Sequence, residues 1–101
     1  AKTLRREFKF SILTDAGEYV REAAGEQVML QGVVDCFWLE PDGIVLVDFK
    51  TDKTPYGADE RAAYYAPQLR AYAKALSRMY NLPVKEKILY FFSCDCAYRL
   101  E

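Results

Sequence analysis

Residues 32–51 read GVVDCFWLEPDGIVLVDFKT, which is two apolar runs on either side of a turn. Pro41 and Gly43 are typical of a tight turn, because proline fixes φ and glycine accepts a positive φ. The flanking runs, 28–39 and 44–49, are rich in residues that favour strands. The sequence therefore predicts a β-hairpin. Both of its faces are apolar, so we expect it to lie inside a sheet that is covered on both sides.

The register of this hairpin decides which residues meet. A two-residue turn pairs Glu40 with Gly43 and, counting back, places Asp35 opposite Asp48. Directly opposed residues share a face, with their Cβ atoms roughly 5 Å apart. A bulge at Gly43 would shift the pairing by one residue, and the sequence leaves that alternative open. Strand alternation predicts that Asp35 shares a face with Val33, Phe37 and Leu39, and that the opposite face carries Val34, Cys36 and Trp38.

A long helix is predicted from 59 to 80, because apolar residues recur there at spacings of three and four. Pro67 lies inside this pattern, so we expect it to start the regular helix or to kink it. The predicted buried stripe consists of Tyr65, Leu69, Tyr72, Leu76 and Met79. The remaining elements are a half-buried strand at 4–12, a loop with a short helical turn at 14–26, a loop at 51–56, and strands at 87–93 and 97–100.

These elements predict an α/β fold with a mixed sheet, in which a helix crosses from the central hairpin to a parallel strand. A length of 101 residues fits a single domain over 1–101. No apolar run is long enough to span a membrane, and no signal-peptide pattern follows the basic residues near the N-terminus. We therefore expect a soluble, cytoplasmic domain without a membrane partner. Three cysteines, at 36, 94 and 96, are predicted to be reduced thiols, with a soft-metal role for the last two as the alternative.

The charge composition limits the function. The net charge is −1, with 14 basic and 15 acidic residues, so a broad basic surface for nucleic acid is not expected. The chain has no histidine, which excludes histidine-based acid–base catalysis and most transition-metal sites. The basic residues Arg70, Lys74 and Arg78 recur every four positions, as DNA-phosphate contacts or, in the simpler interpretation, as a solvated helix face.

Asp35 and Asp48 form the chemical centre of the prediction. Opposed like charges in an apolar setting are unfavourable, and a divalent cation such as Mg²⁺ removes the conflict directly. Lys50 lies two residues beyond Asp48 and so points to the same side of its strand. Such a lysine can help a metal-activated water attack a phosphodiester. The alternative is structural, since a strand-end lysine and isolated aspartates are often surface residues in salt bridges.

Three motifs occur in order: GVVD at 32–35, VDFKTD at 47–52 and QLRAY at 68–72. Together they resemble the RecB-type branch of the PD-(D/E)XK nuclease superfamily, over nearly the whole chain. Within that branch the chain is most similar to the C-terminal nuclease domains of the AddA family, the helicase-nuclease subunits of bacterial AddAB complexes. The resemblance implies a restriction-endonuclease-like fold in a truncated nuclease domain.

The resemblance also implies roles for particular residues. Asp35, Asp48 and the Phe49 carbonyl would bind Mg²⁺ or Mn²⁺, and Lys50 would be the catalytic lysine. Gln68 and Tyr72 match a Gln-x-x-x-Tyr motif that would position water or DNA near the metal. The structural alternatives are an exposed helix residue for Gln68 and a core aromatic for Tyr72. Glu7 would reach the site or, as its alternation with Lys9 suggests, face solvent.

What the resemblance implies overall is a metal-dependent DNA nuclease (exodeoxyribonuclease) domain in an ATP-dependent helicase-nuclease that acts in double-strand-break repair by recombination. Its partners would be DNA, the helicase part of the same polypeptide and a second subunit, in the bacterial cytoplasm near the nucleoid. One departure is the missing upstream metal-ligand histidine, so the isolated segment is expected to cleave weakly or not at all. The alternatives are a catalytically inactive interaction module that docks a partner subunit or guides DNA, and a nuclease that acts on RNA.

Overall fold

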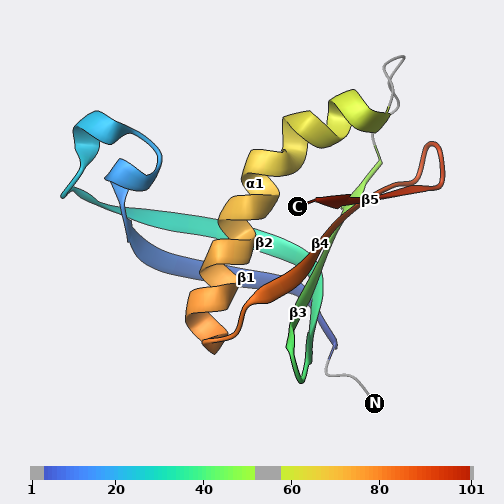
Figure 1. The fold of residues 1–101 in the computed structure, drawn as a ribbon, viewed down its shortest axis with the longest axis horizontal. Helices are drawn as coiled ribbons and strands as arrows, with labels where there is room; N and C mark the ends of the chain where they lie inside the picture. The colour runs from blue at the N-terminus through green and yellow to red at the C-terminus, as the bar shows by residue number, and fades with distance from the viewer. Residues whose placement is uncertain (1–3, 52–57, 101) are drawn as a thin grey trace.

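A five-stranded mixed sheet and one long helix make up the computed structural model, which describes residues 4–51 and 58–100 (Figure 1). The strands lie in the sheet in their chain order, and β3 pairs with β4 in parallel while the other neighbours are antiparallel. This arrangement confirms the predicted α/β fold with a mixed sheet. The strands are β1 (Leu4–Asp15), β2 (Gln27–Glu40), β3 (Gly43–Lys50), β4 (Val84–Phe91) and β5 (Cys96–Leu100).

The hairpin between β2 and β3 has the two-residue turn that the sequence predicts. Glu40 pairs with Gly43, and the ladder continues without a shift to Cys36 opposite Val47. The alternative register, with a bulge at Gly43, is therefore wrong. A side chain at position 43 would meet the Pro83 carbonyl oxygen at 2.9 Å, so the close approach of the chain that leads into β4 requires a glycine here.

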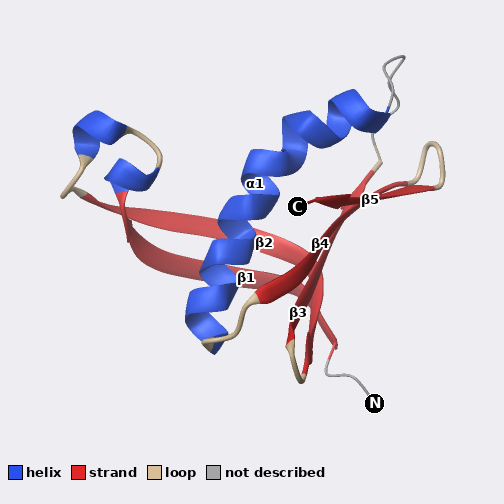
Figure 2. Cartoon of the chain, in the orientation of Figure 1, coloured by secondary structure: helices blue, strands red, loops and turns tan. Residues whose placement is uncertain are grey.

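Helix α1 (Ala58–Tyr80) connects β3 to β4 and lies across one face of the sheet (Figure 2). The helix continues through Pro67, and its course bends along its first half (Figure 1). The predicted loop at 51–56 falls mostly outside the described residues. Among the described residues, no helix is long and apolar enough to cross a membrane.

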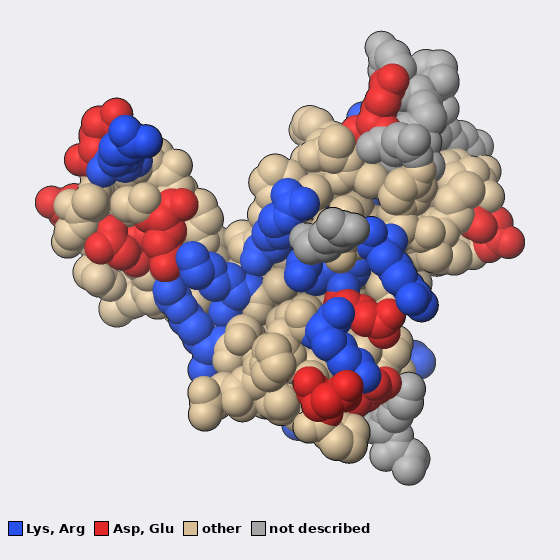
Figure 3. All heavy atoms as spheres, in the orientation of Figure 1, with Lys and Arg blue, Asp and Glu red and all other residues tan. Residues whose placement is uncertain are grey.

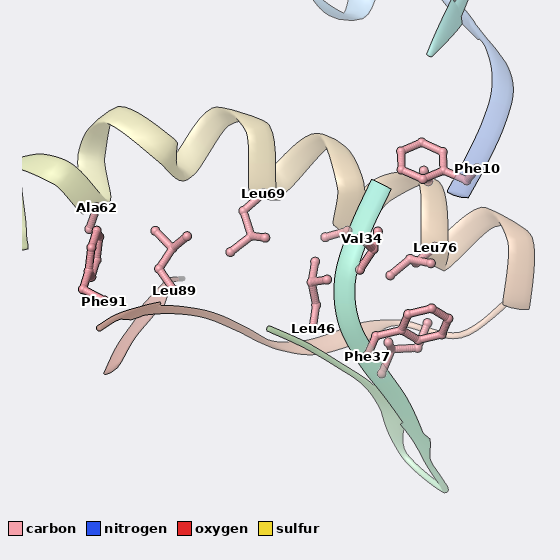
Figure 4. Close-up of a cluster of buried hydrophobic side chains, with 12 residues drawn as sticks. Phe10, Val34, Phe37, Leu46, Ala62, Leu69, Leu76, Leu89 and Phe91 are labelled. Carbon is pink, nitrogen blue, oxygen red and sulfur yellow. The ribbon is translucent and has the colours of Figure 1, made fainter. Parts of the chain in front are cut away.

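The main core lies between α1 and the sheet (Figure 4). Leu69 and Leu76 are at most 1% exposed, and Tyr65 and Tyr72 pack at the border of the core, as the predicted stripe requires. Met79 does not belong to this stripe, because its side chain is 44% exposed. The helix approaches the sheet closely because most of its other buried residues are small, namely Ala62, Ala66, Ala73 and Ala75.

The opposite face of the sheet carries a smaller cluster. Cys36, Val45 and Val47 are buried there against Trp38 and Ile88, which are residues of the sheet itself. No helix of the described chain contributes to this cluster, so the expectation of a sheet covered on both sides is not met by the described residues. Burial raises the pKa of the Cys36 thiol, which keeps it protonated.

The predicted alternation of β2 fails at one point. Val34 is fully buried in the main core together with Phe37, whereas Val33 is 44% exposed, so the face predicted for these two valines is wrong. The cause is a break in the pairing of β1 with β2. Glu7 and Asp35 do not pair, although the residues before and after them do. Glu7 has a φ of 48°, which turns the strand and exchanges the faces.

Beyond this break, β1 and β2 form a long arm that ends in two short 3₁₀ helices, η1 (Ala16–Glu18) and η2 (Arg21–Ala23). Glu18 at the tip of the arm forms ion pairs with Lys74 at 3.0 Å and Arg78 at 2.7 Å on α1. Acidic and basic side chains meet between the tip and the helix (Figure 3). A hydrogen bond from Thr14, followed by one from Lys74, lowers the pKa of Glu18 to about 2. Lys74 and Arg78 therefore brace the arm, which is a use that the sequence did not predict.

The cysteines differ from the prediction in part. Cys94 and Cys96 form a disulfide in the turn between β4 and β5, so the expectation that both are reduced thiols is wrong. Cys36 is free and buried, as predicted.

The first testable prediction concerns Gly32, because the Tyr72 ring of α1 packs directly over this residue of the arm. A Cβ at position 32 would lie 2.6 Å from the Tyr72 ring and 2.9 Å from the Phe10 ring. We expect Gly32→Ala to lower the free energy of unfolding by ~1–3 kcal/mol through overpacking. Urea denaturation measures this change. The double variant Gly32→Ala/Tyr72→Leu should recover most of the loss, and a neutral single variant would contradict this packing.

Candidate active site

The strand residues of the candidate site lie where β2 and β3 separate. The ladder between them ends at Cys36 and Val47, so Asp35 and Asp48 are the next residues on either side. Asp35 Oδ2 accepts a hydrogen bond of 2.9 Å from the backbone N–H of Phe49. The Asp35 carboxylate thus accepts the hydrogen bond that a backbone carbonyl of β2 would accept if the ladder were longer. This contact holds the carboxylate next to Asp48.

Asp48 is the buried member of this pair, since the residue is only 5% exposed. The pKa of Asp48 is raised to about 6: burial is the largest cause, a hydrogen bond with the Asp35 carboxyl adds to it, and Lys50 acts in the opposite direction. Lys50 Nζ lies 2.8 Å from Asp48 Oδ2, which is an ion pair by distance. The same oxygen is buried and has no hydrogen bond of ordinary geometry. Asp48 therefore keeps an incompletely coordinated oxygen beside a second carboxylate.

Helix α1 adds the polar groups that the third sequence motif predicts. Lys50 Nζ donates a hydrogen bond of 3.3 Å to Gln68 Oε1, and Gln68 Nε2 donates one of 3.2 Å to the Tyr72 hydroxyl. Gln68 and Tyr72 are one helical turn apart, so both project toward the end of β3. The structure thus brings together Asp35, Asp48, Lys50, Gln68 and Tyr72, which the sequence analysis named as one site.

Tyr72 combines a core contact with a polar one. Its ring packs edge-on against Phe10, with centroids 5.3 Å apart, and closely over Gly32. Its hydroxyl, at the same time, belongs to the hydrogen-bond chain with Gln68. The core contact fixes the ring, and the fixed ring holds the hydroxyl at the site.

Tyr65 is a site residue that the sequence analysis missed. Its ring lies beneath the Lys50 ammonium, with Nζ 4.1 Å from the ring centroid. The guanidinium carbon of Arg61 lies 5.6 Å from the same centroid. Helical periodicity already accounted for Tyr65 as part of the buried stripe, so nothing in the sequence marked it as a partner of Lys50.

Phe49 and Glu7 complete the set of predicted residues. The N–H and C=O of one strand residue point to the same edge, so the Phe49 carbonyl faces the side on which its N–H meets Asp35. Glu7 lies on β1 across from Asp35 by register, at the break in the pairing. Within the described chain, however, no three His, Cys, Asp or Glu side chains gather as potential metal ligands. Glu7 is therefore near the site in the fold without joining the two carboxylates as a ligand group.

The available oxygens fit a hard divalent cation. Mg²⁺ commonly takes one or two carboxylates and fills the rest of its octahedral shell with water and substrate phosphate. Asp35 and Asp48 supply two carboxylates, and the buried Asp48 oxygen without an ordinary hydrogen bond is the donor that a cation would satisfy. The site offers no thiolate or imidazole, so the donor set favours Mg²⁺ or Mn²⁺ over soft metals.

The raised pKa of Asp48 predicts a pH dependence of stability for the metal-free chain. A folded-state pKa of about 6, above the ordinary value of 3.8, means that protonation of Asp48 stabilises the fold. This contribution is complete below about pH 4 and is lost as the pH rises through about 6. We therefore expect the free energy of unfolding to fall by on the order of 1–2 kcal/mol between pH 5 and pH 7 relative to Asp48→Asn. Urea denaturation of both proteins in chelator measures the difference, and parallel pH profiles would contradict it.

The chain is similar in sequence to known nucleases. The model of the PD-(D/E)XK nuclease superfamily matches residues 1–98. The chain is also 41% identical, over 112 aligned positions, to an "ATP-dependent helicase/nuclease" subunit of Bacillus cereus (strain ATCC 10987 / NRS 248). The proteins of the same name from Bacillus mycoides (strain KBAB4) and Bacillus thuringiensis (strain Al Hakam) are 41% and 40% identical.

In each of these alignments the whole chain is covered, but it spans only 9% of the length of the relative. The similarity therefore concerns one domain-sized part of a much longer protein. A family match over almost the entire sequence, together with this identity, assigns the chain: it belongs to the PD-(D/E)XK nuclease superfamily.

Proposed function

We propose that this chain is a metal-dependent nuclease domain that hydrolyses phosphodiester bonds of DNA. The observation that carries the proposal is the pair of carboxylates, Asp35 and Asp48, at the end of a strand ladder with a lysine beside it. A structural role has no need for two acids that disfavour each other's charge in a buried setting. A hydrolytic site needs them, because they provide the ligands for a cation.

Asp35, Asp48 and the Phe49 carbonyl would hold Mg²⁺, which when bound acidifies water and polarises the phosphoryl oxygen. Asp35 is already oriented for this role by its hydrogen bond from the Phe49 N–H. Lys50 donates from Nζ to the attacking water or to a phosphate oxygen, and its positive charge offsets the negative charge that develops on the phosphate. The ammonium lies on the same side of β3 as Asp48, so one substrate can contact both.

Gln68 and Tyr72 would position the substrate. The side-chain amide of Gln68 accepts a hydrogen bond from Lys50 at its oxygen and donates one to Tyr72 from its nitrogen, so both polar atoms of the amide are engaged. These two contacts fix the orientation of the Gln68 amide. The Tyr72 hydroxyl can still donate one hydrogen bond and accept another at the edge of the site. Preorganised polar groups of this kind lower a barrier because they need little rearrangement in the transition state.

The wider setting of the proposal comes from the relatives, whose name describes part of an ATP-dependent helicase/nuclease. We propose that this domain acts on a single DNA strand delivered by a helicase in the same polypeptide, and that a second subunit completes the complex in bacterial double-strand-break repair by recombination. Delivery by a helicase is consistent with a net charge of −1, because the motor rather than this domain would supply most of the affinity for DNA.

Metal binding provides the first test of this function. We expect calorimetric titration of the chain with Mg²⁺ and with Mn²⁺ to show saturable binding, because the two carboxylates lose their mutual repulsion when a cation binds. The double variant Asp35→Asn/Asp48→Asn should bind neither ion. Asp42→Asn is the matched control, since Asp42 is an exposed carboxylate in the β2–β3 turn. Metal binding that survives in the double variant would place the site elsewhere.

Cleavage provides the second test. In the full-length helicase-nuclease, we expect Asp48→Ala to lower the rate of single-stranded DNA hydrolysis by roughly 10³-fold or more, because a metal ligand is lost. ATP-driven unwinding by the same preparation should continue, which shows that the rest of the protein is folded. A normal cleavage rate in Asp48→Ala would refute the assignment and favour the non-catalytic interaction module instead.

A further inference from the structure

We propose that Tyr65 is a positioning residue for Lys50, holding the catalytic ammonium over its ring face while leaving its charge available to the substrate phosphate. This inference rests on the nuclease function proposed above and deepens it. The site residues of the three sequence motifs do not include Tyr65, so the proposal adds a member from the helix that packs over the site.

The Lys50 ammonium is largely removed from water. Its side chain is 16% exposed, so its positive charge needs partners within the protein. The structure supplies three, in the form of the Asp48 carboxylate at 2.8 Å, Gln68 Oε1 at 3.3 Å and the Tyr65 ring centroid at 4.1 Å. A distance of 4.1 Å lies well within the range of a cation–π contact.

These three partners of Lys50 are not equivalent during the reaction. Asp48 is a proposed metal ligand, and a cation bound to it would compete with Lys50 for the carboxylate. Gln68 and Tyr65 carry no formal charge, so they retain the ammonium without neutralising it. The ring therefore has a role that a carboxylate in its place would not fill, because a carboxylate would consume the positive charge that the substrate needs.

The Tyr65 ring is itself held in place by other rings. Its ring packs against Phe91, with centroids 6.5 Å apart, and edge-on against Tyr64 at 5.0 Å. Phe91 is only 2% exposed and belongs to the main core. A ring held by the core is a rigid surface for a flexible four-carbon side chain, so the position of Lys50 Nζ is determined by the helix as well as by its own strand.

Variants at position 65 test whether Lys50 needs the aromatic face of this side chain or only its volume. In the full-length helicase-nuclease, we expect Tyr65→Leu to lower kcat for single-stranded DNA cleavage on the order of 10²-fold with little change in KM, because Lys50 is displaced rather than removed. Tyr65→Phe keeps the ring and should stay within about threefold of wild type, as should Tyr19→Leu. Tyr19 is the control, because it is an aromatic residue at the tip of the arm, outside the contacts of Tyr65 and Lys50, and is 51% exposed.

Each outcome decides the proposal. A wild-type kcat in Tyr65→Leu overturns it, and so does a Tyr65→Phe variant as slow as Tyr65→Leu, since the hydroxyl rather than the ring would then matter. Thermal unfolding checks that Tyr65→Leu is folded at the assay temperature, and Tyr65→Met provides a second variant without a π face. Asp48→Ala, measured alongside, distinguishes failure of the Tyr65 proposal from failure of the nuclease proposal. If Asp48→Ala is inactive while Tyr65→Leu is normal, the nuclease function stands and only the role of Tyr65 fails.

Discussion

Two carboxylates in a largely buried setting are the constraint on which this site depends. Asp35 and Asp48 lie side by side at the end of the β2–β3 ladder. Burial and the neighbouring carboxyl make the charged form of Asp48 unfavourable. Asp35 gains a backbone hydrogen bond from Phe49, and Asp48 gains the nearby Lys50. Neither partner fully satisfies the pair, as the raised pKa of Asp48 shows. The protein therefore keeps a local charge conflict that a divalent cation would resolve.

A break in the β1–β2 pairing lies beside the two carboxylates. Glu7, with its positive φ, interrupts the pairing across from Asp35, and the faces of both strands exchange there. On one side of the break the strands form the sheet of the domain, and on the other they form the arm that is pinned to α1 through Glu18. Asp35 lies at the boundary, where its carboxylate can turn toward β3. Unusual backbone conformations of non-glycine residues are often found at functional sites for this reason.

Helix α1 contributes the second half of the site. The strands supply the acids and the lysine, whereas the helix supplies Gln68, Tyr72 and Tyr65 around the ammonium. The rings of Tyr65 and Tyr72 are held by core contacts with Phe91 and Phe10, respectively. Packing and chemistry therefore use the same side chains, so a change in the core at either ring would also move a polar group of the site.

The sequence by itself determined the hairpin and its turn, because turn chemistry and strand alternation are local rules. It left two registers open, and the structure has the one in which Asp35 faces Asp48. It also determined the helix and the parallel crossover, since the helical pattern is long and regular. Only the tertiary structure decided the exchanged faces of Val33 and Val34, the exposure of Met79, the Cys94–Cys96 disulfide and the place of Tyr65 under Lys50. Each of these depends on backbone conformation or on contacts between distant segments, which residue spacing along one element does not encode.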